Sequence, residues 1–258
     1  MKNLFYLFLA VTMFSCSDDD SSDTNNDDNN NNNTFICDGV PYDSIVYGTQ
    51  EWTVENACHI TYRDGTPIPQ VTDDTAWRNL TTGAWAYFNN DPTNEVLYNW
   101  YAVAGIHDTD PNTPNKEFAQ EGWHVPSNLE WTTLENYLIA NGYNYDGTTT
   151  GNKIAKSMAS TTGWLSSTTL GTPGNNQSTN NSSGFNAFHT GTRNYYGDFA
   201  PGDGILSDEY VVFWSSTEYQ INNIGAFSRN LYYDSSSLET AYIDGSKAHG
   251  FPVRLVKD

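Results

Sequence analysis

The chain has 258 residues, and its 31 Asp or Glu against 11 Lys or Arg give a formal net charge of −20. Nucleic-acid binding depends on clustered lysine and arginine, so this balance excludes an electrostatic nucleic-acid binder. Hydrophobic residues make up only 37%, yet aromatic residues alone make up 14%. This composition predicts a small aromatic core rather than a disordered chain.

The first fifteen residues have the pattern of an export signal. Lys2 precedes the apolar run 4–14, which ends at the small residue Ser15. The run is much shorter than the ~20 residues of a membrane-spanning helix, so we interpret residues 1–15 as a signal peptide. Cys16 follows directly and resembles the lipid-bearing cysteine of a bacterial lipoprotein, although the two residues before Ser15 fit that motif poorly. An ordinary secretory signal with a coincidental cysteine is the alternative.

Residues 16–34 are predicted to form a lipidated cysteine followed by a disordered tether. The segment 17–34 consists of Asp, Asn, Ser and Thr and contains no apolar side chain, so it has nothing to bury against the entropy of the chain. Its acidic start, 17–20, resembles the export tag of surface lipoproteins of the Bacteroidetes group. The expected localisation is therefore the outer membrane, with a lipid anchor as the only membrane contact and exposure at the cell surface.

A single globular domain is expected over residues 35–258, where 25 acidic and 10 basic side chains leave a formal charge of −15. With Cys16 assigned to the lipid, Cys37 and Cys58 remain, and in an exported protein they are expected to form a disulfide. Closing a loop of about 21 residues contributes roughly 3 kcal/mol. A zinc site is the weaker alternative, because two cysteines make half a structural site and no histidine spacing completes it.

Most of this domain has short segments rich in Thr, Tyr, Val and Trp between Gly, Asn and Asp, which is typical of strands and turns. The expected strands are 42–47, 51–54, 59–62, 84–88, 97–103, 211–215, 226–233 and 251–256. Ser127 three residues before Glu130 forms a capping-box pattern, and it predicts a helix that ends at Asn141. A second, shorter helix is expected over 153–160. The residues 170–183 are nearly all Gly, Asn, Ser and Thr and predict a long loop.

The sequence contains none of the common catalytic or phosphate-binding motifs. His124 lies between Trp123 and Val125, a setting more typical of a hydrogen-bonded core residue than of a catalytic base. No cofactor is expected. The acidic loops 91–95 and 108–110 are compatible with structural calcium, although solvated turns explain them better, and the ligands of any metal stay unknown.

The aromatic excess is the strongest functional signal. Exposed tyrosines on a rigid β scaffold stack on sugar rings or anchor protein partners at a small entropic cost. Four tyrosines near expected strand ends in the last third of the chain are the candidate ligand-binding residues: Tyr219, Tyr232, Tyr233 and Tyr242. The alternative is that the aromatic rings fill the core, which we expect for most of the tryptophans.

Several motifs spread along the chain match one family in the same order. The matching residues are Gly48-Thr49-Gln50-Glu51-Trp52, Glu55-Asn56, Tyr62-Arg63-Asp64-Gly65, Leu97-Tyr98-Asn99-Trp100-Tyr101-Ala102-Val103, Gly122-Trp123-His124-Val125-Pro126-Ser127, Glu130-Trp131, Gly184-Phe185, Gly191 with Arg193, Trp214-Ser215-Ser216-Thr217-Glu218 and Gly250-Phe251-Pro252-Val253-Arg254-Leu255-Val256-Lys257-Asp258. Together they resemble the Fibrobacter succinogenes major paralogous domain family and cover nearly all of residues 40–258.

This resemblance implies an α+β fold similar to C-type-lectin-like domains of the formylglycine-generating-enzyme variety, with short twisted strands, two helices and long loops. It places the ligand face of that fold between residues 214 and 250. Relatives commonly carry a Cys before the Gly-Trp-His-Val-Pro segment and another near the end, where this chain has 118–121 and Leu255. The resemblance therefore implies that a disulfide of relatives is missing here and that Cys37 and Cys58 provide a different one.

The same resemblance argues against catalysis. Enzymes of that fold depend on cysteines near the end of the chain, and residues 59–258 contain none. The calcium-dependent sugar signatures of true C-type lectins are also absent from the sequence. The sequence thus predicts a non-catalytic surface module that binds polysaccharide or glycoprotein. An adhesive or structural envelope protein with a protein partner is the alternative, and a glycoside hydrolase with unrecognised carboxylates is a third hypothesis.

Overall fold

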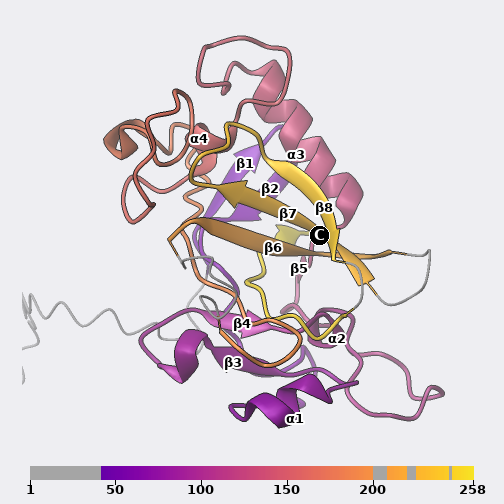
Figure 1. The fold of residues 1–258 in the computed structure, drawn as a ribbon. Helices are drawn as coiled ribbons and strands as arrows, with labels where there is room; N and C mark the ends of the chain where they lie inside the picture. The colour runs from indigo at the N-terminus through magenta and orange to yellow at the C-terminus, as the bar shows by residue number, and fades with distance from the viewer. Residues whose placement is uncertain (1–41, 200–207, 220–224, 244–245) are drawn as a thin grey trace, which may run out of the picture. The chain divides into compact units, whose positions relative to one another are not determined.

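The computed structural model describes residues 42–199, 208–219, 225–243 and 246–258 (Figure 1). Cys16, Cys37 and the predicted signal peptide and tether lie outside these residues, so those expectations stay predictions. The described part is an α+β arrangement of small antiparallel sheets and short helices, as expected. No helix in these ranges has the length and apolarity needed to cross a membrane.

Three sheets make up the β part of the described residues. The first has the strand order β1 (Ser44–Tyr47), β2 (Gln50–Thr53), β9 (Val256–Lys257) and β5 (Trp123–His124). The second pairs β3 (Trp85–Tyr87) with β4 (Val96–Tyr98), and the third has the order β6 (Tyr210–Tyr219), β7 (Gly225–Tyr232) and β8 (Glu239–Ile243). The end of the chain thus pairs with strands from its beginning and middle.

Four α-helices and two 3-10 helices occur in the described part, where two helices were expected. They are α1 (Asp74–Arg78), α2 (Trp100–Val103), α3 (Asn128–Ala140), α4 (Ala155–Met158), η1 (Phe88–Asn90) and η2 (Gln177–Thr179). The two predicted helices are confirmed as α3 and α4. The two additional ones, α1 and α2, are only one turn long, and each begins at a side-chain cap, from Asp73 and Asn99 respectively.

The capping box predicted for the long helix is present. Ser127 Oγ accepts a hydrogen bond from the backbone N–H of Glu130, and the Glu130 carboxylate accepts one from the N–H of Ser127 at 2.7 Å. Two backbone donors at the start of the helix, the N–H groups of Ser127 and Glu130, are therefore satisfied. Further along, α3 buries Trp131, Leu134 and Leu138. Their helical spacing in the sequence therefore predicts the inner face of the helix correctly.

Strand β6 separates two hydrophobic cores. Alternating residues point to opposite faces of a strand, and in the first six residues of β6 both faces are covered. Val211 and Phe213 lie in the core that α3 and α4 share with β1 and β2. Val212 and Trp214 lie in the other core, with residues of α2, β3 and β4. Figure 1 shows β6 between these two groups of elements.

The strand expectations fail where a polar side chain redirects the backbone. The predicted strand 97–103 becomes β4 followed by α2, because Asn99 accepts a hydrogen bond from Ala102 N and starts the helix. The predicted strand 59–62 forms only an isolated bridge, between Thr61 and Pro67. Most of the predicted strand 251–256 is irregular: Phe251 forms an isolated bridge with Tyr98, and Val256 begins β9.

The long Gly- and Asn-rich loop 170–183 is held by polar side chains of α4 and of the loop itself. The Lys156 ammonium donates to the backbone carbonyl of Asn175 and to Asn180 Oδ1. The buried Asn180 amide in turn donates to the carbonyls of Ser160 and Pro173, at 2.8 and 2.9 Å. These bonds satisfy backbone carbonyls in and beside a loop whose regular structure is the short helix η2, so the amide-rich composition serves folding here.

Candidate functional site

The structure brings two of the four predicted tyrosines together. Tyr219 at the end of β6 and Tyr242 on β8 stack with ring centroids 4.3 Å apart and an interplanar angle of 9°. The strand between them is β7, where Gly225 pairs directly with Tyr219. Gly225 carries no side chain, and the ring contact between Tyr219 and Tyr242 crosses β7.

A third ring supports this stack. Phe227 of β7 pairs directly with Tyr242 and meets the Tyr219 ring edge-on, at a centroid distance of 5.6 Å. Directly paired residues share one face of a sheet, so the three rings form one group, which we call the tyrosine stack. Tyr242 is 51% exposed on the last strand of the sheet. The stack is therefore an aromatic surface that the sheet holds in place.

The other two predicted tyrosines lie elsewhere. Tyr232 ends β7 seven residues from Gly225, about 23 Å along the strand. It is half-buried beside Tyr210 and accepts a hydrogen bond from the Asn230 amide. Tyr233 is half-buried against the core around α3. The four tyrosines thus do not form one face, because the strands carry them to opposite ends of the sheet.

Sequence reasoning missed another exposed pair, Tyr195 and Tyr196. Their ring centroids lie 3.9 Å apart in the turn 194–198, and their exposed fractions are 36% and 46%. The sequence signal was the Asn-Tyr-Tyr-Gly-Asp pattern, because Asn and Gly around two aromatic residues are typical of a tight turn that presents them.

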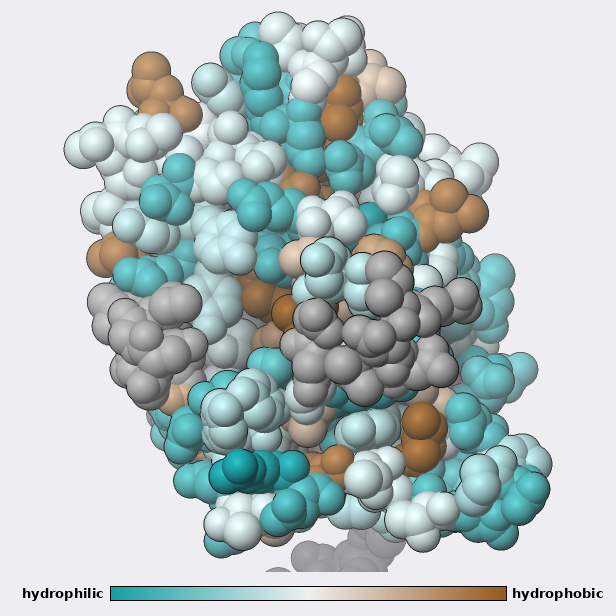
Figure 2. All heavy atoms as spheres, turned by 45° about the vertical axis from the view of Figure 1, so that its right-hand side comes forward, coloured by the Kyte–Doolittle hydropathy of each residue, from teal (hydrophilic) through white to brown (hydrophobic). Residues whose placement is uncertain are grey.

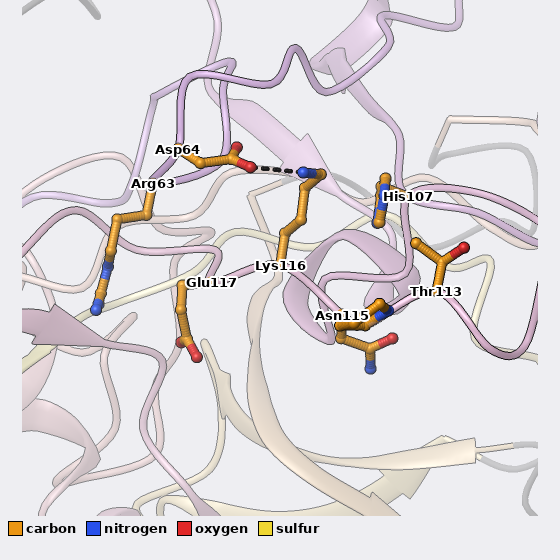
Figure 3. Close-up of a pocket in the computed structure, with 8 residues that line it drawn as sticks. Arg63, Asp64, His107, Thr113, Asn115, Lys116 and Glu117 are labelled. Carbon is orange, nitrogen blue, oxygen red and sulfur yellow. Dashed lines mark hydrogen bonds and ion pairs between the residues drawn. The ribbon is translucent and has the colours of Figure 1, made fainter.

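A surface hollow of about 460 Å³ lies beside the loop 106–117 (Figure 3). Lys116 forms an ion pair with Asp64 at 2.5 Å across it. Arg63 lies at its edge and donates to the backbone carbonyls of three other residues, namely Ala119, Gln120 and Trp123. These charges already have partners within the protein, so the hollow offers fewer groups for a ligand than its lining suggests.

The acidic loop predicted as a possible calcium site lies at a second hollow next to the first one. Asp108 accepts a hydrogen bond from the backbone N–H of Asp110, and Asp110 accepts two from Asn112. Asp91 in the other loop likewise accepts from the backbone and hydroxyl of Thr93. In the residues that the structure describes, no group of three or more His, Cys, Asp or Glu has a geometry suited to a metal ion.

His124 joins the capping box to the end of the chain. Its Nε2 and Nδ1 each lie 2.7 Å from a carboxylate oxygen, of Glu130 and Asp258 respectively. Burial works against the charged ring, but the hydrogen bonds to both carboxylates outweigh it and raise the pKa of His124. The three side chains form a hydrogen-bonded clamp between β5, α3 and Asp258. The hydrogen-bonded role expected for His124 is confirmed, but its place in the core is wrong, because the ring is 34% exposed.

A buried polar network lies in the core that contains β4. Arg254 is fully buried and donates to Asn56 Oδ1, and the Asn56 amide donates to the Glu95 carboxylate at 3.0 Å. Burial raises the pKa of Glu95 to about 7, against the hydrogen bond from Asn56 and the charge of Arg254. Further guanidinium bonds reach four carbonyls, of Thr53, Val54, Phe185 and Asn186. This network ties the segments around 54, 95, 185 and 254 together.

Figure 2 shows one face on which hydrophobic side chains are scattered in small groups among hydrophilic ones. The aliphatic side chains with the highest exposed fractions are those of Val46, Leu129 and Leu170, which come from separate parts of the chain. Tyrosine lies near the middle of the hydropathy scale, so exposed tyrosines do not stand out in this colouring. The candidate surface is therefore defined by ring geometry rather than by a hydrophobic patch.

Comparison with known families gives one match, to the Fibrobacter succinogenes major domain over residues 45–257. The chain belongs to this family. The match spans the whole described part except its ends, which confirms the resemblance drawn from the motifs. Neither the search of curated proteins nor the search of solved structures found a significant match.

In this member of the Fibrobacter succinogenes major domain family, the motif residues that carry the resemblance build the scaffold. Trp52, Trp131 and Trp214 are fully buried, and so is Arg254 of the closing segment. The Gly-Trp-His-Val-Pro-Ser segment supplies β5 and the cap of α3. The tyrosines of the stack lie outside these motifs, so family membership explains the core and leaves the surface to be interpreted on its own.

Proposed function

We propose that this protein is a non-catalytic surface lipoprotein whose globular domain binds a neutral polysaccharide or the glycan of a glycoprotein. The observation that carries the proposal is the tyrosine stack, with Tyr242 half-exposed and parallel to Tyr219. The domain is proposed to have a C-type-lectin-like fold, with Cys16 as the lipid anchor in the outer membrane and residues 17–34 as the tether.

The stack supports glycan binding because its rings are placed before a ligand arrives. Tyr219 and Tyr242 contact each other and Phe227, and all three project from paired strands. A tyrosine has few rotatable bonds and a large flat area, so stacking a sugar on the open side of Tyr242 orders little further structure. A tyrosine hydroxyl can both donate a hydrogen bond to a sugar hydroxyl and accept one from it.

Charge favours a neutral ligand. Residues 35–258 carry a formal charge of −15, which repels polyanionic chains at low ionic strength. The carboxylate nearest to the stack in sequence, Glu218, is paired with the Lys247 ammonium, so it is already engaged with a protein cation. This pairing favours a structural role for Glu218 over the role of a catalytic acid.

The binding claim is tested with intact cells that display the full chain, incubated with insoluble cellulose, xylan, mannan and starch. Retention on at least one of these polysaccharides is expected, with Tyr242→Ala reducing it about tenfold and Tyr242→Phe retaining it. Tyr145→Ala is the matched control, because Tyr145 is 45% exposed and lies outside the stack. Equal retention of wild type and Tyr242→Ala would contradict the assignment of Tyr242 to the binding site.

The same cells distinguish a glycan ligand from the alternative of a protein partner. If no polysaccharide retains them and crosslinking of intact cells gives one stable protein complex that Tyr242→Ala abolishes, the ligand of the stack is a protein. The glycan proposal then fails while the site stands.

The anchor is tested separately by changing Cys16 to Ser in the full chain. Palmitate labelling of wild type and its loss in Cys16→Ser are expected, with release of the variant from the membrane fraction. A variant that stays in the outer membrane and a wild type without label would overturn the lipoprotein assignment.

A further inference from the structure

The turn 194–198 is a rigid support for two exposed rings. Arg193 and Gly250 exchange backbone hydrogen bonds at its base, at 3.0 and 2.7 Å. The Asn194 side chain accepts from the backbone N–H groups of Tyr196 and Asp198. Gly197 has φ +101, and a side chain there would collide with the backbone of Asp74. The backbone of the turn is therefore held by the hydrogen bonds at its base, by the Asn194 side chain and by its close packing against Asp74.

The rings of this turn continue a row of contacting aromatic rings that starts in the core. Trp214 contacts Phe251, Phe251 stacks on His249, and His249 lies 5.3 Å from Tyr195. Tyr195 then contacts Tyr196, at 3.9 Å between ring centroids. Each ring is braced by the one behind it, so the two outer tyrosines are ordered without a ligand.

Arg78 completes the cluster at its outer end. The guanidinium carbon lies 5.1 Å from the centroid of Tyr196, in cation–π contact, and the side chain is exposed. Within the described ranges, Arg78 is the one basic side chain without a hydrogen bond or ion pair to another described residue. The other nine all have one, namely Arg63, Lys116, Lys153, Lys156, Arg193, Arg229, Lys247, Arg254 and Lys257.

The surroundings of this cluster decide which ligand suits it. Its aromatic area and open guanidinium donors match a sugar ring, which has apolar faces and several acceptor hydroxyls. Acidic sugars fit less well, because Asp73, Asp74 and Asp198 all act electrostatically on the neighbouring Arg193. Asp74 alone is directly paired with that arginine, so the local charge stays negative. A neutral sugar is the better match.

We propose that Tyr195, Tyr196 and Arg78 form a second binding site for a neutral sugar, separate from the tyrosine stack. The inference shares its ligand class with the proposed function and so rests on it in that respect, but it uses different residues. Two sites on one anchored domain allow two contacts with one polysaccharide, or with neighbouring chains, and increase its retention through avidity.

The test observes each site by its own tyrosines. The full chain is purified in detergent with fluorinated tyrosine, and resonances are assigned by Tyr→Phe variants. The probes are neutral hexasaccharides of glucose, xylose and mannose, with a hexasaccharide of galacturonic acid as the anionic arm. We expect at least one neutral probe to shift Tyr195 and Tyr196 in wild type and in Tyr242→Ala alike.

Variants within the site test how much each side chain contributes to affinity. Tyr196→Ala, observed through Tyr195, should weaken binding about tenfold, and Arg78→Gln should weaken it severalfold. Tyr145→Ala should leave it unchanged. Because Tyr196 is at the surface, the variant should keep the near-UV circular dichroism of wild type, which serves as the folding control.

The outcomes separate this inference from the proposed function. Shifts at Tyr219 and Tyr242 without shifts at Tyr195 and Tyr196 overturn the second site and leave the first intact. Shifts at Tyr195 and Tyr196 alone support the second site and overturn the assignment of the first. Tighter binding of the galacturonic acid probe overturns the choice of a neutral sugar, and the absence of any shift overturns both proposals.

Discussion

Two groups of aromatic rings in this domain have similar geometry and opposite surroundings. Around α3, Trp52, Trp131, Phe185 and Phe213 form a fully buried cluster with centroid distances from 4.7 to 6.1 Å. At the far end of β6, the tyrosine stack has similar ring distances and a half-exposed outer ring. The buried group stabilises the fold, whereas the exposed group keeps half of the Tyr242 side chain in contact with solvent.

The difference follows from where each ring lies on β6. The first part of this strand is covered on both faces, so Phe213 lies in a core. The pairing of β6 with β7 shifts between Trp214 and Glu218, and beyond that irregularity the strand is only partly covered. The same strand therefore supplies core residues at one end and surface residues at the other.

The largest loss of stability is expected in the buried cluster. Trp131→Ala removes the ring that contacts Trp52, Phe185 and Phe213, and it should lower the free energy of unfolding by about 3–5 kcal/mol. Trp131→Phe keeps a ring and should recover part of this loss. Urea denaturation measures both, and a cost below about 1 kcal/mol for the alanine variant would contradict a packed cluster.

The buried network gives the next largest effect, as a dependence on pH. Burial raises the pKa of Glu95 from 4.5 to about 7, which corresponds to about 3 kcal/mol. Since the folded pKa is the higher one, this contribution is present in full below about pH 4.5 and is lost as the pH rises through about 7. Glu95→Gln should flatten this dependence, as measured by denaturation at pH 5 and 8. Parallel curves for both proteins would show that Glu95 is not responsible.

The tyrosine stack should matter much less to stability. Tyr242→Ala removes a cross-strand pair on an exposed strand, and the expected cost is about 0.5–1 kcal/mol. Thermal unfolding of wild type, Tyr242→Ala and Tyr242→Phe measures it. A cost as large as that of Trp131→Ala would mean that the stack belongs to the core, and the contrast between the two groups would disappear.

The smallest effect is expected at the His124 clamp. Its pKa is raised above 6.5, so the stabilisation is complete below about pH 6.5 and is lost as the pH rises through the higher folded value. The histidine and both carboxylates are partly exposed, which limits the contribution to about 0.5 kcal/mol. Unfolding of wild type and His124→Gln should converge at pH 9. A gap between them that widens from pH 6 to pH 9 would contradict the clamp.

The sequence predicted the parts of the fold that depend on local pattern. The helix that starts after Ser127 and the burial of most tryptophans are both found, and seven of the eight tryptophans are buried. The one-turn helix α2 was missed, because a single Asn99 cap within an apolar run has the hydrophobicity of a strand. The segment 251–255 was predicted as a strand but is mostly irregular, because its backbone hydrogen bonds go to four separate partners rather than to one strand, namely Tyr98, Trp214, Ala57 and Thr53.

The site was predictable only in part, for a reason that lies in strand register. All four predicted tyrosines lie at or next to strand ends, as expected, but only Tyr219 and Tyr242 stack on each other. The sequence contained no indication of β8, which was not predicted, and therefore none of which tyrosines stack. Tyr195 and Tyr196 depend on contacts with Arg78 and His249, which are far away in sequence.

The most direct test of the account is a double-mutant cycle on glycan affinity. Wild type, Tyr219→Ala, Tyr242→Ala and the double variant are compared on the polysaccharide that retains wild-type cells best. Because the two rings form one stack, each single change should weaken binding about tenfold, and the double variant should be little weaker than either one. Unchanged affinity in all three variants would contradict the central claim that this stack is the glycan-binding surface.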